Sequence, residues 1–292
     1  MIKYLFLLLL PILVSTKVLL QGHYSKSKVR SLCDTFYLTG FIFSAISLIT
    51  GVLFFRVWPS GSTVLFALLF GVVNYVYQVS YSAAFHAGPV SLTSIICNFN
   101  MIVIVPFGAL VFKERIGPYQ WIGFVLVAAA MVLLNKPSND NEKKANLKWL
   151  LLAILTMVTS GFTGILQSAY GKYFPSEEKD SFIVVAYIVA SLLCFVTALI
   201  MKKTKKTDFF KVDLKFVGGI AVIGAALGLY NILIIEVQAR QYFTSSVLFP
   251  VLSVLNFIMT LAASILFLKE RIKLRQWIGV LVGTVAVVLM NL

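Results

Sequence analysis

The sequence predicts an all-α membrane protein with ten transmembrane helices, arranged as two inverted repeats of five helices each. Two observations support this prediction. Apolar runs long enough to span a bilayer, about 20 residues, recur along the chain, and the second half repeats motifs of the first. Apolar residues make up 60% of the 292 residues and charged residues only 12%, a composition that would leave large apolar patches on a water-soluble fold.

The apolar runs divide into five in each half of the chain. The first half has runs near 2–21, 33–55, 62–85, 90–112 and 119–134, and the second near 147–171, 181–201, 216–237, 245–268 and 276–292. The runs are continuous and do not alternate between polar and apolar residues, so helices are favoured over the strands of a membrane barrel. The first run lacks a strongly cationic start and a cleavage site, so we interpret it as a helix and not as a secretory signal.

Two stretches of the sequence are nearly the same in the two halves. They read FKERIGPYQWIGFVLVAAAMVLLN at 112–135 and LKERIKLRQWIGVLVGTVAVVLMN at 268–291. Upstream, VLLQGHYSK matches GILQSAYGK, and Asn100 pairs with Asn256 at the same 156-residue offset as the long stretches. The duplication therefore covers nearly the whole chain.

The repeat unit contains five predicted spans, which is an odd number. We predict a first repeat at 1–135, a linker at 136–146 and a second repeat at 147–292. A copy that follows an odd number of spans enters the membrane from the opposite side, so the two copies are predicted to be inverted. Inverted repeats are typical of secondary transporters, in which the two halves open a central site alternately to either face.

The joints KERIGPYQWIG and KERIKLRQWIG, together with Pro250 in LFPVLS, resemble the EamA branch of the drug/metabolite transporter superfamily. The resemblance covers essentially the full length and implies a transporter of small metabolites. Two features depart from the family pattern: LLPILVSTK lacks the Trp-Gly pair common in the first helix, and Ser94 stands where the fourth helix usually has proline. Both departures lie where cargo would be recognised, so the resemblance leaves the cargo open.

Polar residues form stripes on several predicted spans, and such faces point at protein or water and not at lipid. The predicted substrate-binding residues are Asn74, Tyr77, Gln78 and Tyr81 in the third span, Asn100 and Asn256 in the fourth and ninth, Thr163 and Gln167 in the sixth, and Lys17 in the first. The stripe in the sixth span also includes Thr156, Thr159, Ser160 and Tyr170. Aromatic faces beside amides can bind a planar ring or an organic cation. The structural alternatives are tyrosines at the membrane interface, amides that join helices, and hydroxyls that bond to their own helix.

Two charged residues lie inside predicted spans. Lys17 can bind a carboxylate or phosphate of the cargo or release its proton during transport; alternatively its long side chain extends to the interface, which we favour. Glu236 is the candidate for coupling to a proton or cation, but Arg240 at i+4 offers a simple ion pair, which we again favour. Asp34 and Asp180 begin two spans and are interpreted as helix caps.

No catalytic constellation, nucleotide-binding loop or metal-ligand spacing occurs in the sequence, so we expect no enzyme activity, no cofactor and no metal. The net charge of +14 is assigned to loops that face the cytoplasm and anionic lipid, and not to nucleic-acid binding. The expected partners are a small-molecule substrate and the lipid bilayer, with the protein as a monomer or homodimer.

These features together predict a secondary transporter that moves a small organic solute, such as an amino acid, amine or aromatic metabolite, across the cytoplasmic membrane by alternating access. The alternative is a flippase for a lipid-linked substrate. A membrane enzyme or receptor belongs to a different class and would give no solute flux. Loop charges place both termini outside the cytoplasm, whereas the family resemblance implies both inside; labelling at Leu292 distinguishes the two.

Overall fold

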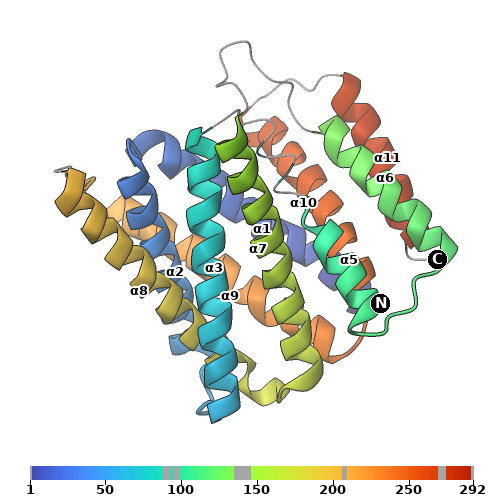
Figure 1. The fold of residues 1–292 in the computed structure, drawn as a ribbon, viewed down its shortest axis with the longest axis horizontal. Helices are drawn as coiled ribbons and strands as arrows, with labels where there is room; N and C mark the ends of the chain where they lie inside the picture. The colour runs from blue at the N-terminus through green and yellow to red at the C-terminus, as the bar shows by residue number, and fades with distance from the viewer. Residues whose placement is uncertain are drawn as a thin grey trace.

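A computed structural model describes residues 2–87, 93, 96, 99–134, 146–205, 209–268 and 274–290 of the chain. Within these ranges the chain forms helices and no strand. The helices stand side by side as a bundle, and the first helix begins on the same side of the bundle on which the last helix ends (Figure 1). This arrangement agrees with an even number of crossings.

The helices follow one another in chain order, with short joints between them. They are α1 (Ile2–Lys28), α2 (Leu32–Phe54), α3 (Gly61–Ala87), α5 (Met101–Leu110), α6 (Pro118–Leu134), α7 (Leu147–Tyr173), the 3-10 turn η1 (Ser176–Glu178), α8 (Lys179–Lys205), α9 (Leu214–Ala239), α10 (Ser245–Leu268) and α11 (Leu274–Met290). The fourth predicted span, 90–112, is described mainly through α5. Ser94, which lies in this span, is outside the described residues.

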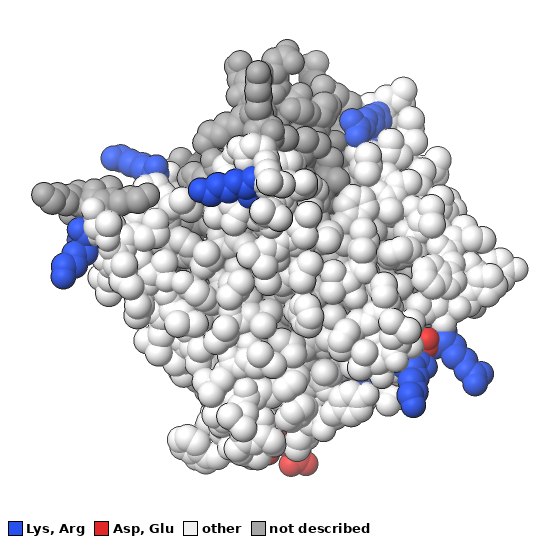
Figure 2. All heavy atoms as spheres, in the orientation of Figure 1, with Lys and Arg blue, Asp and Glu red and all other residues white. Residues whose placement is uncertain are grey.

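The outer surface of the bundle suits a membrane. Six helices in the described ranges are long and apolar enough to cross a bilayer, and four more apolar helices are shorter: Met101–Leu110, Pro118–Leu133, Ser245–Met259 and Leu274–Met290. On the face shown in Figure 2, the Lys, Arg, Asp and Glu side chains lie along the upper and left edges and at the bottom and lower right, and the area between them is uncharged. Helices suit this area because they satisfy their own backbone hydrogen bonds, which a bilayer core requires.

Polar side chains fix the starts of several helices. Ser31 and Asp34 form a capping box at α2, where Asp34 Oδ2 accepts from the Ser31 backbone N–H at 3.1 Å, which confirms the predicted cap. Asp213 caps α9 through the Phe216 backbone N–H at 2.8 Å. The cap predicted for Asp180 is not confirmed, because its Oδ1 accepts no hydrogen bond within the part of the chain that is described.

Helices α2 and α8, the second helix of each half, pack against each other along their length. The Cys33 thiol near the start of α2 donates to the Ala198 carbonyl at 3.2 Å, near the end of α8. Further along α2, Ser47 Oγ donates to the Val184 carbonyl at 3.1 Å, near the start of α8. Rising residue numbers in one helix meet falling numbers in the other, so the two helices are antiparallel.

Helices α6 and α11, the last helix of each half, form a second antiparallel pair. Arg275 Nη2, at the start of α11, donates to the Val132 carbonyl near the end of α6 at 2.6 Å. At the other end of the pair, a Cβ on Gly123 would lie 3.1 Å from the Ala286 carbonyl oxygen. Glycine therefore allows the two backbones to approach closely, as small residues do between membrane helices.

The third helix of each half packs against the other half. Helix α3 contacts α7 and α8, whereas α9 contacts α1 and α2. Gly71 in α3 and Gly228 in α9 stand 157 residues apart, and each marks a close approach. A Cβ on Gly71 would lie 2.5 Å from the Ala186 carbonyl oxygen, and one on Gly228 would lie 2.6 Å from Thr50 Oγ1. The two halves thus contact each other in the same way.

A carboxylate in the joint between α5 and α6 also ties the halves together. Glu114 accepts hydrogen bonds from the backbone N–H groups of Ser245 and Ser246, at 3.0 and 2.9 Å, and so caps α10. Lys172 at the end of α7 forms an ion pair with it. Burial alone would raise the pKa of Glu114, but the hydrogen bonds from Lys172, Ser246 and Ser245 outweigh burial and hold that pKa below its usual value.

Replacing Gly71 by alanine is expected to destabilise the protein, because the new Cβ would meet backbone and not a movable side chain. Such overpacking costs about 1–3 kcal/mol and would appear as a lower Tm in detergent. Gly218→Ala in α9 is the matched control, since nothing lies within 4 Å of its Cβ position. Equal Tm values for the two variants would contradict the packing described for α3.

Replacing Glu114 by glutamine is expected to lower the Tm at neutral pH, through loss of charged hydrogen bonds that contribute about 1.5–3 kcal/mol each. The folded-state pKa lies below the ordinary value of 4.5, so the stabilisation is complete above that value and is lost as the pH falls through the folded-state pKa. The Tm difference from wild type should therefore shrink in acid. Glu177→Gln, at an exposed position, serves as control; a difference that persisted in acid would count against this role of Glu114.

Candidate functional site

A cavity of about 530 Å³ lies between the two halves of the chain. Residues on α1, α2, α3 and α5 line it from the first half, and residues on α7, α8, α9 and α10 line it from the second. Pockets of about 300–1,000 Å³ typically hold small organic molecules. The pairs α2–α8 and α6–α11 bring the halves together, and α2 and α8 also form part of the cavity wall.

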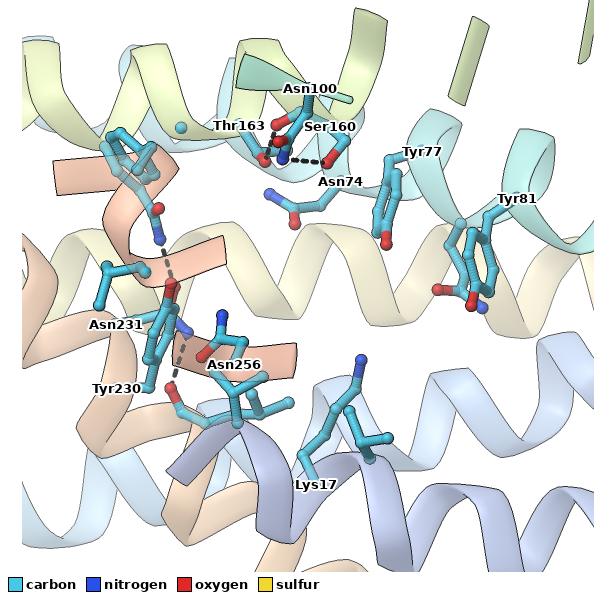
Figure 3. A pocket seen from close by; sticks show the side chains of 18 of the residues that line it. Lys17, Asn74, Tyr77, Tyr81, Asn100, Ser160, Thr163, Tyr230, Asn231 and Asn256 are labelled. Carbon is cyan, nitrogen blue, oxygen red and sulfur yellow. Dashed lines mark hydrogen bonds between the residues drawn. The ribbon is translucent and has the colours of Figure 1, made fainter. Parts of the chain in front are cut away.

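All nine residues that the sequence predicted as substrate-binding line this cavity: Lys17, Asn74, Tyr77, Gln78, Tyr81, Asn100, Thr163, Gln167 and Asn256. Figure 3 shows most of them as sticks, on helices of both halves. The structure therefore brings together side chains from opposite ends of the sequence. Their contact with a substrate stays a prediction.

A buried amide network joins α7 to α8 and α9. Gln167 Nε2 donates to Asn231 Oδ1 at 2.7 Å, and the Tyr187 hydroxyl donates to the same oxygen at 3.3 Å. Asn231 Nδ2 in turn donates to the Leu227 carbonyl at 2.7 Å. Because Asn231 is bonded on both sides, the network fixes the orientation of this wall of the cavity.

Asn100 and Asn256, the pair related by the repeat, offer acceptors to the cavity. Asn100 Nδ2 donates to Ser160 Oγ at 3.0 Å and so connects the start of α5 to α7, as expected for an amide that joins helices. The Oδ1 atoms of Asn100 and Asn256 are buried and accept no hydrogen bond from any described residue. An unsatisfied buried acceptor costs about 1–3 kcal/mol, so a donor from a solute would be favourable at either oxygen.

The hydroxyls of α7 bond mainly within their own helix. Thr163 Oγ1 donates to the Ser160 carbonyl at 2.7 Å, and Thr156 and Thr159 donate to carbonyls of the preceding turn. Neither of these two residues nor Tyr170 lines the cavity, so the prediction that the whole stripe faces the cavity is wrong for these three. The helix extends beyond the cavity at both ends, and only its middle turns lie beside it.

Helix α3 contributes amides and aromatic rings. Asn74 Nδ2 donates to the Phe70 carbonyl at 2.9 Å, and Gln78 Nε2 donates to a serine hydroxyl one turn later at 3.3 Å. The rings of Tyr77 and Tyr81 have centroids 5.7 Å apart, and both side chains point into the cavity (Figure 3). Neighbouring rings of this kind provide faces on which an aromatic solute can pack.

Lys17 directs its ammonium into the cavity (Figure 3). It lies 11 residues before the end of α1 at Lys28, which is about 16 Å at 1.5 Å per residue. This placement agrees with the alternative in which Lys17 faces the cargo and not with the favoured extension to the interface, and its contact with a solute stays a prediction. The rotation of α1 in the bundle turns Lys17 toward the centre.

The two halves of the chain also match a known family. The EamA-like transporter family matches residues 1–136 and 147–292. The chain belongs to this family. Members are multi-pass membrane transporters of the drug/metabolite type, not enzymes, which confirms the resemblance found in the sequence and the prediction of a membrane transport protein.

The fold of this EamA-like protein recurs among solved structures. One of them, described as the crystal structure of a protein, has a TM-score of 0.71 and 15% sequence identity, and the match covers 98% of each chain. Such a likeness concerns the fold alone. No curated protein matches the sequence.

The other charged groups of this EamA-like protein form no second site in the described ranges. Glu236 does not line the cavity; its carboxylate forms ion pairs with Lys179 and with Arg240. This geometry agrees with the ion-pair alternative, and the coupling role of Glu236 stays a prediction. No group of three or more His, Cys, Asp and Glu residues is placed to bind a metal ion among the residues searched, which are those that the structure describes.

Helix α9 of this EamA-like protein forms a wall of the cavity that the sequence did not predict. Tyr230 and Asn231 line the cavity but were not predicted to. The repeat contained a signal: Asn231 follows Asn74 by 157 residues, the same spacing as Gly228 after Gly71. Both asparagines also donate to the carbonyl four residues earlier. The repeat therefore extends through the third helix of each half, where Asn231 is the counterpart of Asn74.

If the cavity of this EamA-like protein holds water, Thr163→Cys should react with a charged methanethiosulfonate reagent in a background without Cys33, Cys97 and Cys194. Leu192→Cys is the control, since Leu192 is 58% exposed on the outer face of α8. A thiol in hydrocarbon does not ionise readily, so its reaction should be slower by about an order of magnitude or more. Equal labelling rates, measured by mass spectrometry, would contradict a hydrated cavity.

Proposed function

We propose that this protein is a secondary transporter of the cytoplasmic membrane that moves a small organic solute by alternating access. The observation that carries the proposal is the cavity between the halves, lined by amides, tyrosines and one lysine from both of them. In this proposal ten helices span the bilayer, five in residues 1–135 and five in 147–292, with 136–146 as linker. One chain supplies both halves, so a monomer suffices for transport.

The helix directions support an inverted repeat. Helix α2 is antiparallel to α8 and α6 is antiparallel to α11, and each pair joins helices in the same position of the two halves. A two-fold axis in the membrane plane reverses the direction of every helix that it relates. The same axis accounts for the packing of α3 on α7 and α8 and of α9 on α1 and α2.

This symmetry supports alternating access. In one conformation the cavity is open at one end of the bundle and closed at the other. If the two halves exchange conformations, the open end closes and the closed end opens. Glu114 holds the joint of the first half against α10 of the second, beside Lys172. These contacts lie at one end of the bundle, and the opposite conformation would have to release them. The binding free energy of the solute at the cavity can bias this exchange.

Uptake into sealed proteoliposomes tests the proposal. A thermal-shift screen of amino acids, amines, nucleosides, sugars and organic acids identifies a solute that binds, and the purified protein alone is expected to accelerate its flux. A receptor or an enzyme would bind without flux, and a flippase would need a lipid headgroup on the substrate. Binding without flux would therefore contradict the proposal.

In the thermal-shift assay, Tyr77→Ala and Gln167→Ala are expected to weaken solute binding about tenfold. Each variant would lose a ring contact or one hydrogen bond, which contributes about 1–1.5 kcal/mol. Thr159→Ala is the matched control, because Thr159 lies on α7 outside the cavity. If both cavity variants bind the solute as the wild type does, the assignment of this cavity is wrong.

A further inference from the structure

The described part of the cavity wall carries one charged side chain, and no described residue pairs with it. Among the described residues that line the cavity, Lys17 is the only Lys, Arg, Asp or Glu. Its ammonium makes no ion pair or hydrogen bond with any residue in the described ranges. Burying an ammonium without a partner is unfavourable, and a charged group inside a membrane bundle commonly marks a solute pathway.

The groups around Lys17 complement an oxyanion. The Tyr77 and Tyr81 side chains point toward the same central space from the opposite wall (Figure 3). Asn74 and Asn256 also line this space. Tyrosine hydroxyls and amide nitrogens are hydrogen-bond donors. They can therefore bind those oxygens of an anion that do not contact Lys17. A charged hydrogen bond of this kind is stronger than a neutral one.

The rest of the lining complements an aromatic or apolar body. Phenylalanine side chains at Phe43, Phe70, Phe249 and Phe257 line the cavity beside the tyrosines. Rings pack favourably on one another in offset or edge-to-face arrangements. The cavity therefore combines one fixed positive charge, several polar donors and an aromatic wall.

We propose that the cavity selects organic oxyanions, carboxylates or phosphates carried on an aromatic or apolar body, with Lys17 as their counter-charge. The inference rests on the proposed function for the role of the cavity and narrows its substrate class. Tyrosine rings without a nearby positive charge could bind an amine cation, but the positive charge of Lys17 repels it. The solute binds only where its negative charge meets the ammonium.

Four probes of similar shape test the charge preference by calorimetry on purified protein in detergent, at neutral pH and low salt. They are hydrocinnamate, the neutral hydrocinnamamide, the cation phenethylamine, and phenyl phosphate. At least one anion is expected to bind tenfold or more tightly than the amide, with no detectable binding of the amine; the stronger anion shows whether the site prefers carboxylate or phosphate. Binding of the amide or amine as tight as that of both anions, or no binding by any probe, overturns the proposal.

Variants then assign the preference to Lys17. Lys17→Met is expected to abolish the difference between anion and amide, and Lys17→Arg to retain it. Lys28→Met is the matched control, because Lys28 pairs with Asp213 at the end of α1 and lies outside the cavity, so the preference should be unchanged. An anion preference that survives in Lys17→Met overturns the proposal. The wild-type comparison decides it alone if a variant does not fold.

Binding and flux separate this inference from the proposed function. Calorimetry in detergent requires no transport, so an anion that binds through Lys17 without flux contradicts the transporter and leaves the charge preference standing. Flux of a neutral or cationic solute, with anions excluded, keeps the transporter and overturns the anion preference.

Discussion

The close approach of the two halves along antiparallel helix pairs is the constraint on which the cavity depends. In hydrocarbon no hydrophobic force drives helices together, so association relies on small residues and on hydrogen bonds between helices. At the α2–α8 pair, Ser44 and Ser191 share a hydrogen bond of 2.6 Å, and Gly40 makes room for the Phe195 ring. Once these pairs are fixed, the other helices pack across the interface, and together with α2 and α8 they enclose the cavity.

The polar groups of the cavity divide into those that the protein satisfies and those that it leaves available. Gln167 and Asn231 are held by each other and by neighbouring backbone, which makes that wall rigid. The carbonyl oxygens of Asn100 and Asn256 have no donor among the described residues. A rigid frame with a few open acceptors is the arrangement expected of a binding pocket, since ordering free side chains would reduce affinity.

Charge is distributed in the same manner. Glu114 pairs with Lys172, and Glu236 with Lys179, toward the ends of the bundle, and each carboxylate is largely buried beside its partner. Lys17 is different because it lies among apolar and neutral polar groups at the centre. Among the described residues, these carboxylates are thus paired in contacts between helices, whereas Lys17 places its positive charge in the space between the halves.

The sequence by itself determined the helices, the duplication and nine of the polar and aromatic residues that line the cavity. Run length distinguishes spanning helices from strands, and polar residues such as Asn74 and Gln167 inside apolar runs cannot face lipid, so their inward direction was predictable. Tertiary structure decided that Thr156 lies beyond the cavity, that Lys17 turns to its centre, and that Asn231 completes its wall. Helix rotation and tilt are set by packing against neighbouring helices. These contacts join residues that are far apart in the sequence, and the hydropathy pattern does not encode which of them meet.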